Sequence, residues 1–203
     1  MFSGIVLAGG TSKRMERDKR LLVFNNQTLL ERSVKRLQKI TTKVVVVLAK
    51  EDKFDMNDVV FTHDSESGKG PLMGIYSGLL KIKTENAVVM PVDTPFIRIS
   101  FLKYLMKNAS DYDIVVPRWS RGIEPLAAIY SKNMIQIIRE YIESGKKTAP
   151  HLLINELNRK KVRFIEEDEI RKFGNPEILF YNINTQDDLD NANKILELIN
   201  ERH

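Results

Sequence analysis

Short apolar runs alternate along the chain with longer segments in which apolar residues recur every three or four positions. An unbroken run rich in β-branched residues, such as residues 44–48, is typical of a strand that is covered on both faces of a sheet. The runs that predict strands are residues 5–7, 44–48, 59–61, 87–90, 114–116, 126–130 and 178–181. A repeated strand pattern of this kind favours an α/β protein.

Helices are predicted between these strands from apolar spacing and start signals. Thr28 and Glu31 have the spacing of a capping box, and Val34 and Leu37 follow on one helical face. Other predicted helices begin near Pro71, Ser100, Ser131 and Thr185. Gly145 is expected to end the helix that starts at Ser131.

The strand–helix alternation predicts a mainly parallel sheet with helices on both faces. No repeat, low-complexity tract or linker divides the chain, so residues 1–203 are expected to form a single domain. In sheets of this kind, ligands bind outside the carboxyl ends of the strands. The residues that follow each predicted strand are therefore the first candidates for a site.

Composition and charge narrow the class of protein. The chain has no cysteine, which excludes disulfides and thiolate chemistry, and it has neither a signal-peptide pattern nor an apolar run that could span a bilayer. A cytoplasmic protein without membrane contact is expected. The net charge of +5 suits anionic ligands, but no nucleic-acid-binding motif accompanies it, so nucleic acid is not an expected partner.

The loop after the first predicted strand has the composition of an anion site. Gly9 and Gly10 leave room for backbone N–H groups to approach a phosphate. Hydroxyl and cationic side chains follow at Thr11, Ser12, Lys13, Arg14, Arg17 and Lys19. A strand that runs into such a loop predicts a site for a nucleoside triphosphate, although a Gly-Gly pair alone is more often an ordinary turn.

Asp93 is the most distinctive carboxylate, because it follows the predicted strand 87–90 and lies between Pro91 and Pro95, which restrict the backbone. A single carboxylate there suits Mg²⁺, whose other ligands are water and phosphate oxygens. Taken alone, the Asp-Thr-Pro sequence would favour a structural turn. Residues 68–71, Gly-Lys-Gly-Pro, form a second phosphate-attracting pattern before a helix, but neither a P-loop nor a Gly-x-Gly-x-x-Gly motif is present.

Several blocks of sequence together resemble the molybdenum cofactor guanylyltransferase family. They occur in the family's order and extend over nearly the whole chain, at residues 7–15, 18–19, 70–74, 91–96, 124–126 and 182–185. The resemblance implies a Rossmann-like three-layer α/β/α fold of the nucleotide-diphospho-sugar transferase type. It also implies transfer of GMP from GTP to molybdopterin with release of pyrophosphate, with Mg²⁺ as cofactor and a molybdoenzyme or cofactor-delivery protein as a possible partner.

The resemblance also assigns roles to residues of this sequence. Leu7, Ala8 and Gly9 match positions that hold the guanine nucleotide, and Asp64 matches an aspartate that contacts it. Lys19 matches the lysine on the phosphates, and Asp93 matches the Mg²⁺ ligand. Asn182 and Asn184 fall in a block near the metal and the acceptor. The family pattern is not followed at Glu16, where glycine is usual, at Leu48, where asparagine is common, or at Ala127, where histidine is usual.

The reaction predicted on this basis is direct in-line transfer without a covalent enzyme intermediate. Lys19 and Arg14 are expected to stabilise charge on the departing pyrophosphate, and the backbone N–H groups of Gly9 and Gly10 to hold the phosphates. The three histidines, His63, His151 and His203, form no cluster in the sequence. Residues 145–148 and the helix after them could help to shape the acceptor side, but a solvated linker is favoured for this segment.

Three other functions stay open on the sequence. The nearest is a nucleotidyltransferase of the same fold with another acceptor, such as a sugar phosphate, a polyol phosphate, or molybdopterin in a CTP-dependent reaction. Another is a nucleotide-binding protein without catalysis, which Glu16 would favour. The third is a basic nucleic-acid binder, which steep salt dependence of binding would reveal.

Overall fold

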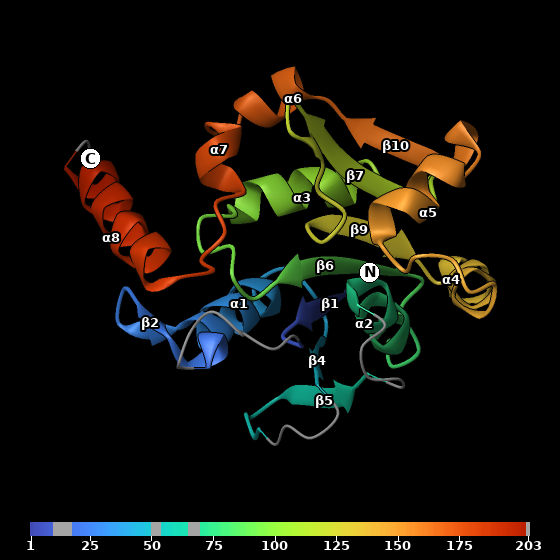
Figure 1. Cartoon of the computed structure of the whole chain (residues 1–203), viewed down its shortest axis with the longest axis horizontal. Helices are drawn as coiled ribbons and strands as arrows, with labels where there is room; N and C mark the ends of the chain where they lie inside the picture. Colours follow the sequence, from blue (N-terminus) through green and yellow to red (C-terminus); the bar gives the residue numbers. More distant parts are fainter. Residues whose placement is uncertain (10–17, 50–53, 65–69, 202–203) are drawn as a thin grey trace.

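The computed structural model describes residues 1–9, 18–49, 54–64 and 70–201. Its centre is a sheet with the strand order β10-β7-β9-β6-β1-β4-β5 (Figure 1). These strands are β1 (Phe2–Leu7), β4 (Val44–Leu48), β5 (Val59–His63), β6 (Asn86–Pro91), β7 (Ile114–Trp119), β9 (Ala128–Ser131) and β10 (Val162–Ile165). β9 is antiparallel to β6 and β7, whereas the other neighbours in this order are parallel. The predicted mainly parallel sheet is confirmed.

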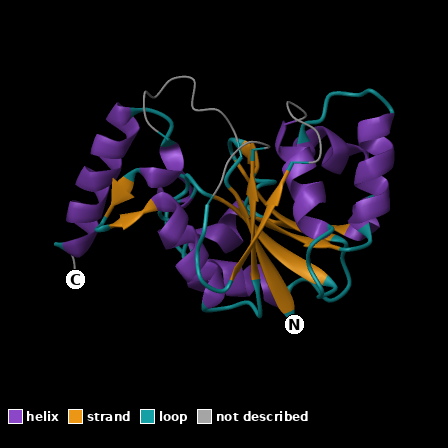
Figure 2. Cartoon of the chain, turned by 90° about the horizontal axis from the view of Figure 1, so that it is seen from below, coloured by secondary structure: helices purple, strands orange, loops and turns teal. Residues whose placement is uncertain are grey.

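Helices lie on both faces of the sheet, which gives three layers (Figure 2). The helices are α1 (Leu29–Gln38), α2 (Gly70–Leu79), α3 (Ile99–Lys107), α4 (Met134–Glu143), α5 (Pro150–Glu156), α6 (Glu167–Arg171), α7 (Pro176–Leu179) and α8 (Gln186–Asn200). Alternate residues of each central strand face opposite layers. Val46 packs into a core shared with α1, α3 and α8, whereas its neighbour Val47 packs into a second core with α2, α4 and α5. The run 44–48 is fully buried for this reason.

The predicted helix starts are confirmed where the side chain of the cap residue bonds to the helix backbone. Thr28 and Glu31 form the expected capping box at α1, and Thr185 caps α8. Gly145 follows α4 with a φ of +74°, as a helix-ending glycine requires. Two predicted caps are wrong. α3 begins after Arg98, so that Ser100 lies inside the helix, and Ser131 is the last residue of β9.

The predicted strand at residues 178–181 is wrong, because residues 178 and 179 belong to the short helix α7 and Phe180 caps its end. The Asn175 side chain accepts a hydrogen bond from the Glu177 N–H, and Pro176 occupies the first turn, where its fixed φ suits a helix. Leu179 and Phe180 are buried. The apolar pattern of residues 178–181 is therefore compatible with a buried strand or a buried helix. The helix start signals at Asn175 and Pro176 explain why a helix forms. The predicted strand at residues 126–130 begins later, at Ala128.

Some elements were not predicted. β2 (Val23–Phe24) and β3 (Gln27–Thr28) form a hairpin whose turn residues, Asn25 and Asn26, have φ values of 51° and 60°. Asparagine tolerates this left-handed region better than most residues. β8 (Gly122–Ile123), which pairs with β7, and β10 were also missed. Within the described ranges, no helix is long and apolar enough to cross a membrane.

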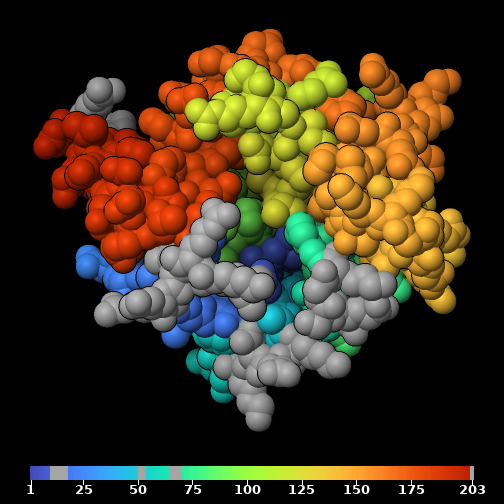
Figure 3. Space-filling model, viewed as in Figure 1, coloured from blue at the N-terminus to red at the C-terminus, as the bar shows by residue number. Residues whose placement is uncertain are grey.

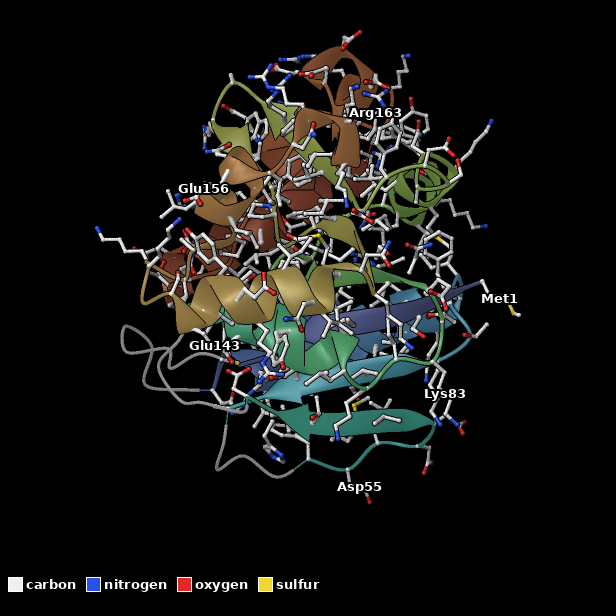
Figure 4. The ribbon with its side chains drawn as sticks, turned by 90° about the vertical axis from the view of Figure 1, so that its right-hand side faces the viewer. Met1, Asp55, Lys83, Glu143, Glu156 and Arg163 are labelled. Atoms are coloured by element: carbon white, nitrogen blue, oxygen red, sulfur yellow. The ribbon has the colours of Figure 1, made fainter. Side chains whose placement is uncertain are left out.

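The parallel strands place their carboxyl ends at one edge of the sheet. In Figure 4, Met1 and Lys83 mark the opposite edge, where β1 and β6 begin. The segments that follow β1, β5 and β6 therefore meet at a common edge, and they contain most of the residues expected at the site.

Candidate active site

A cavity of about 1280 Å³ opens at the carboxyl ends of the strands. Figure 3 shows the hollow near the centre of this face, with the blue N-terminal residues at its base. Residues from eight of the expected positions line it, namely Leu7, Ala8, Gly9, Lys19, Asp64, Asp93, Asn182 and Asn184. The structure thus brings together, in one cavity, all the predicted site residues that it describes.

The base of the cavity is the end of β1. The Ala8 N–H donates to the Val47 carbonyl at 2.9 Å, and the Val92 N–H donates to the Leu7 carbonyl at 3.1 Å. These bonds extend the sheet pairing by one residue on each side of β1. A Cβ on Gly9 would lie 3.3 Å from Asp64 Oδ2, which is closer than most such contacts. Glycine therefore allows the backbone to pass directly beside the Asp64 carboxylate.

Lys19 lies between two oxygen atoms at the side of the cavity. Its Nζ is 2.8 Å from Asp93 Oδ2 and 2.7 Å from Asn184 Oδ1. Asp93 follows β6, and the Asp93 carbonyl accepts a hydrogen bond from the Ile183 N–H at 3.0 Å. This bond holds the segment before α8 against the end of β6. Residues 19, 93 and 184 meet here although they are far apart in the sequence.

A local ion pair fixes the turn that carries Lys19. Asp18 precedes a short 3₁₀ helix, Lys19–Leu21, and accepts hydrogen bonds from both the backbone and the guanidinium of Arg20. The side-chain hydrogen bond from Arg20 is the main reason why the pKa of Asp18 is lowered. Arg20 Nη1 also approaches the Ala8 carbonyl at 3.5 Å. The Asp18-x-Arg20 spacing is the sequence signal that could have indicated this support.

Asp64 has a different environment from Asp93. Its Oδ1 is buried and accepts no hydrogen bond from the described part of the chain. Burial raises the pKa of this carboxyl to about 6, and the nearby His63 acts in the opposite direction. The Asp64 N–H donates to the Leu48 carbonyl, and this bond fixes the backbone at Asp64. The carboxylate lines the cavity and can still accept hydrogen bonds from a ligand.

The far side of the cavity comes from the second half of the chain. Lys147, Thr148 and His151 line it, so the segment 145–148, whose first three residues are exposed as expected of a solvated linker, also borders the site. Pro150 starts α5, and Leu153 and Ile154 of this helix pack into the second core. Glu124 also lines the cavity; burial raises its pKa, while its hydrogen bond from Trp119 Nε1, 2.8 Å long, acts against this.

Some predicted positions cannot be placed. Gly10 and Arg14 lie outside the described residues, and so do the other hydroxyl and cationic residues of 11–17, Glu16 and the glycine–lysine pair at 68–69. Of the two described departures from the family pattern, Leu48 is completely buried in the core, and Ala49 is the residue beside it that lines the cavity. Ala127 lines the cavity near Glu124.

The fold and this cavity are those of a nucleotidyltransferase. A family model described as "MobA-like NTP transferase domain" matches residues 4–161. The "Probable molybdenum cofactor guanylyltransferase" of Methanosarcina mazei is 39% identical over 202 residues, which cover 93% of this chain and 88% of that protein. A protein of the same description from Peptoclostridium acidaminophilum is 31% identical, over 96% of this chain and 90% of the relative.

A solved structure supports the same assignment. The "Molybdopterin-guanine dinucleotide biosynthesis protein A" of Archaeoglobus fulgidus has a TM-score of 0.79 and 25% identity, and covers 97% of this chain and 99% of that one. The protein described here belongs to the MobA-like NTP transferase family. The expected nucleotide-diphospho-sugar transferase fold is confirmed.

Proposed function

We propose that the protein transfers GMP from GTP to molybdopterin, with release of pyrophosphate. The observation that carries the proposal is one cavity containing Lys19, Asp93 and Asp64, with the end of β1 as its base. The relatives with names that specify this reaction match the chain over nearly its whole length. The alternative acceptors considered from the sequence receive no comparable support.

The guanine base is proposed to bind at Asp64. An ionised carboxylate accepts two hydrogen bonds side by side, and guanine presents two adjacent donors, N1–H and N2–H₂. Asp64 Oδ1 supports this assignment: no described residue donates to it, and a buried carboxylate oxygen gains most from a ligand that supplies a donor. Leu7, Ala8 and Gly9 would line the nucleotide beside it.

The triphosphate is proposed to extend from the base of the cavity toward Lys19. The reaction is an in-line displacement: an oxygen of the terminal phosphate of molybdopterin forms a bond to the α-phosphorus of GTP. The bond from the α-phosphorus to the oxygen bridging it to the β-phosphorus breaks, and pyrophosphate leaves with the electron pair. The Lys19 ammonium would stabilise the charge that develops on this leaving group, and the predicted partners Gly10 and Arg14 would add to it.

A phosphate nucleophile is already anionic near neutral pH, so the proposed step needs no general base. Transfer would therefore depend on how the protein orients its two substrates and compensates their charge. Residues from α5 and the segment before it, Lys147, Thr148 and His151, would form the acceptor side.

Mg²⁺ is the proposed cofactor, with Asp93 as its protein ligand. The donor chemistry fits, because Mg²⁺ commonly binds through one or two carboxylates and keeps water and phosphate oxygens as its other ligands. The Lys19 ammonium against Asp93 also supports the fit, since it is a cation already held at this carboxylate. When bound, the ion would neutralise charge on the phosphates of GTP.

The remaining expectations are parts of the same proposal. Residues 1–203 are taken as a single nucleotidyltransferase domain, which is supported by the segment beyond the matched family region: Asn182 and Asn184 line the cavity, and Ile183 packs into the shared core. A cytoplasmic location accords with a chain that has no cysteine. A molybdoenzyme or delivery protein as recipient of the product stays a prediction.

The test is pyrophosphate release with each of the four nucleoside triphosphates, with and without molybdopterin, in the presence of Mg²⁺. Release only with GTP and molybdopterin together supports the proposal. Release with CTP in place of GTP, or with a sugar phosphate in place of molybdopterin, would contradict it. GTP binding without release under all of these conditions would indicate a non-catalytic nucleotide-binding protein.

A further inference from the structure

Among the described residues, Lys19, Asp93 and Asn184 form a cluster in which the Lys19 ammonium compensates the charge of the Asp93 carboxylate. The Lys19 side chain is 17% exposed and that of Asp93 is 21% exposed, so solvent reaches this ion pair only in part. The ammonium contacts one carboxylate oxygen and one amide oxygen at hydrogen-bonding distance. The position next to Asp93 is thus filled by a cation that the chain itself supplies.

The backbone at Asn184 is held by hydrogen bonds that do not involve Lys19. The Asn184 N–H donates to Asp188 Oδ2 at 2.9 Å, and the same oxygen accepts from the Thr185 N–H at 2.8 Å. Burial alone would raise the pKa of Asp188, but these bonds, together with the Thr185 side chain and the nearby Lys19 charge, outweigh it and the pKa is lowered. On the other side, the Ile183 N–H is bonded to the Asp93 carbonyl. Asn184 is therefore fixed between the start of α8 and the end of β6.

We propose that Asn184 is a positioning residue that holds Lys19 on Asp93 in the nucleotide-free protein. Asp93 then accepts a divalent cation only together with a polyphosphate that draws Lys19 away. The inference rests on the proposed function, because it takes Asp93 as the metal ligand and GTP as the polyphosphate.

The physical reason is competition for one carboxylate. A divalent cation at Asp93 would lie within a few ångströms of the Lys19 ammonium, and the two positive charges would repel each other strongly at this partly buried position. A triphosphate offers the ammonium several negative oxygens, and the flexible four-carbon stem of lysine allows the ammonium to move to them. Release of Lys19 then makes Asp93 available to the cation that accompanies the nucleotide.

Such an arrangement has a consequence for the order of binding. The free protein should bind a divalent cation weakly, and the nucleotide should raise that affinity. By the reciprocity of linked equilibria, the cation should raise the affinity for GTP by the same factor. Removal of the Lys19 charge should break this coupling, because Asp93 would then be available from the start.

The test is Mn²⁺ binding without nucleotide, measured by the loss of the EPR signal of free Mn²⁺. Lys19→Met and Lys19→Gln should each bind Mn²⁺ about tenfold more tightly than the wild type, whereas Lys19→Arg, which keeps the charge, should stay weak. Lys35→Met is the matched control, since Lys35 is exposed on α1, and it should behave as the wild type. Tight binding of Mn²⁺ alone by the wild type, equal to that of Lys19→Met, would overturn the inference.

The role of Asn184 is tested by a double-mutant cycle. Asn184→Ala should tighten binding of Mn²⁺ alone about threefold, because Lys19 loses one of its two oxygen partners. In the Lys19→Met background the same change should have no further effect, since Asn184 acts through Lys19. A weakening of Mn²⁺ binding in that background would contradict the positioning role. An effect on folding alone would leave the Mn²⁺ affinity of Asn184→Ala unchanged and would also contradict it.

The proposed function is tested separately by the same measurement with GTP added, and uptake is counted relative to GTP and Mn²⁺ without protein, because GTP itself binds Mn²⁺. Wild-type protein that takes up Mn²⁺ only with GTP supports both the function and the inference. Uptake of Mn²⁺ neither alone nor with GTP would count against Asp93 as the metal ligand and so against the proposed function. Equal uptake with and without GTP would overturn the inference and leave the function standing.

Discussion

Two carboxylates of the cavity, Asp93 and Asp64, stand at strand ends on opposite sides of β1, in opposite electrostatic surroundings. Asp93 is paired with the Lys19 ammonium at 2.8 Å. Asp64 has a buried oxygen without a hydrogen-bond donor from the described residues, and burial raises its pKa to about 6. A carboxylate that is paired with a cation suits a site for a charged ligand. A carboxylate without hydrogen-bond donors suits a ligand that supplies N–H donors of its own.

The difference suggests how one cavity accommodates the two ends of a nucleotide. The Lys19–Asp93 side is suited to the phosphates and their cation, and the Asp64 side to the base. Both sides depend on the sheet for their spacing, because Asp64 follows directly on β5 and Asp93 lies two residues beyond the end of β6. Variants at each side should therefore produce effects of different kind as well as different size.

The largest effect is expected for Asp93→Asn. Loss of the charge proposed to bind the metal should lower the rate of pyrophosphate release at least about 1000-fold, while the fold is kept because the side chain retains its shape. Initial rates with saturating GTP measure this. Asp111→Asn, which changes an exposed carboxylate, is the control. Near wild-type activity of Asp93→Asn would remove Asp93 from the account.

Lys19→Ala should lower turnover about 100-fold and weaken GTP binding only a few-fold, because the ammonium acts mainly on charge that develops in the transition state. Steady-state rates and calorimetric titration with GTP separate the two quantities, with Lys35→Ala as the control. Weaker GTP binding with unchanged turnover in Lys19→Ala would instead assign Lys19 to ground-state binding alone.

Asp64→Asn should weaken GTP binding about tenfold and leave ATP binding nearly unchanged, because only guanine uses both oxygens of the carboxylate. Titration of the variant with both nucleotides gives the comparison. Asp55→Asn is a suitable control, since Asp55 is exposed and lies at the periphery of the molecule (Figure 4). A parallel loss for both nucleotides would place Asp64 away from the base.

The smallest effect is a dependence of GTP affinity on pH. With a pKa of about 6, Asp64 is mostly ionised at pH 7 and mostly protonated at pH 5.5, and only the ionised form accepts two donors. GTP affinity should therefore fall about fourfold between these pH values in the wild type. Asp64→Asn should show no such fall, and an identical fall in the variant would assign the titration to another group.

The same pKa fixes the sign of a stability effect. Because the pKa of Asp64 is higher in the folded protein than the ordinary value of an aspartate, 3.8, the folded state binds more protons between about pH 4 and pH 6. The contribution of Asp64 to stability is therefore lost as the pH rises through this window. Asp64→Asn lacks this loss, so the free energy of unfolding of the wild type should fall relative to the variant from pH 4 to pH 7, as chemical denaturation would measure.

Much of this site follows from the sequence because parallel sheets bring strand ends together. Gly9, Asp64 and Asp93 each come directly or shortly after an apolar run, so the pattern that predicted the strands also predicted where these residues would meet. Lys19 was expected near the phosphates, and it lies in the same cavity. Three-residue spacing was equally informative at Thr28 and Thr185, where the capping bonds are local.

Long-range contacts and ambiguous apolar runs could not be predicted in this way. The bond between Lys19 and Asn184 joins residues 165 positions apart, and the resemblance placed Asn184 only near the metal and acceptor. The return of residues 147–151 to the cavity depends on the direction in which α5 leaves α4, which no local pattern specifies. At residues 178–181 the apolar residues face the core as predicted, but the preceding cap residue Asn175 and Pro176 start a helix in place of the predicted strand.

The most direct test of the account is a crystal structure of the protein with GTP and Mn²⁺, with the ion located by its anomalous scattering. The account predicts an Mn²⁺ peak at the Asp93 carboxylate, the Lys19 ammonium moved from Asp93 onto the phosphates, and the guanine edge against Asp64. A nucleotide bound in the reverse direction, or an ion held away from Asp93, would contradict it.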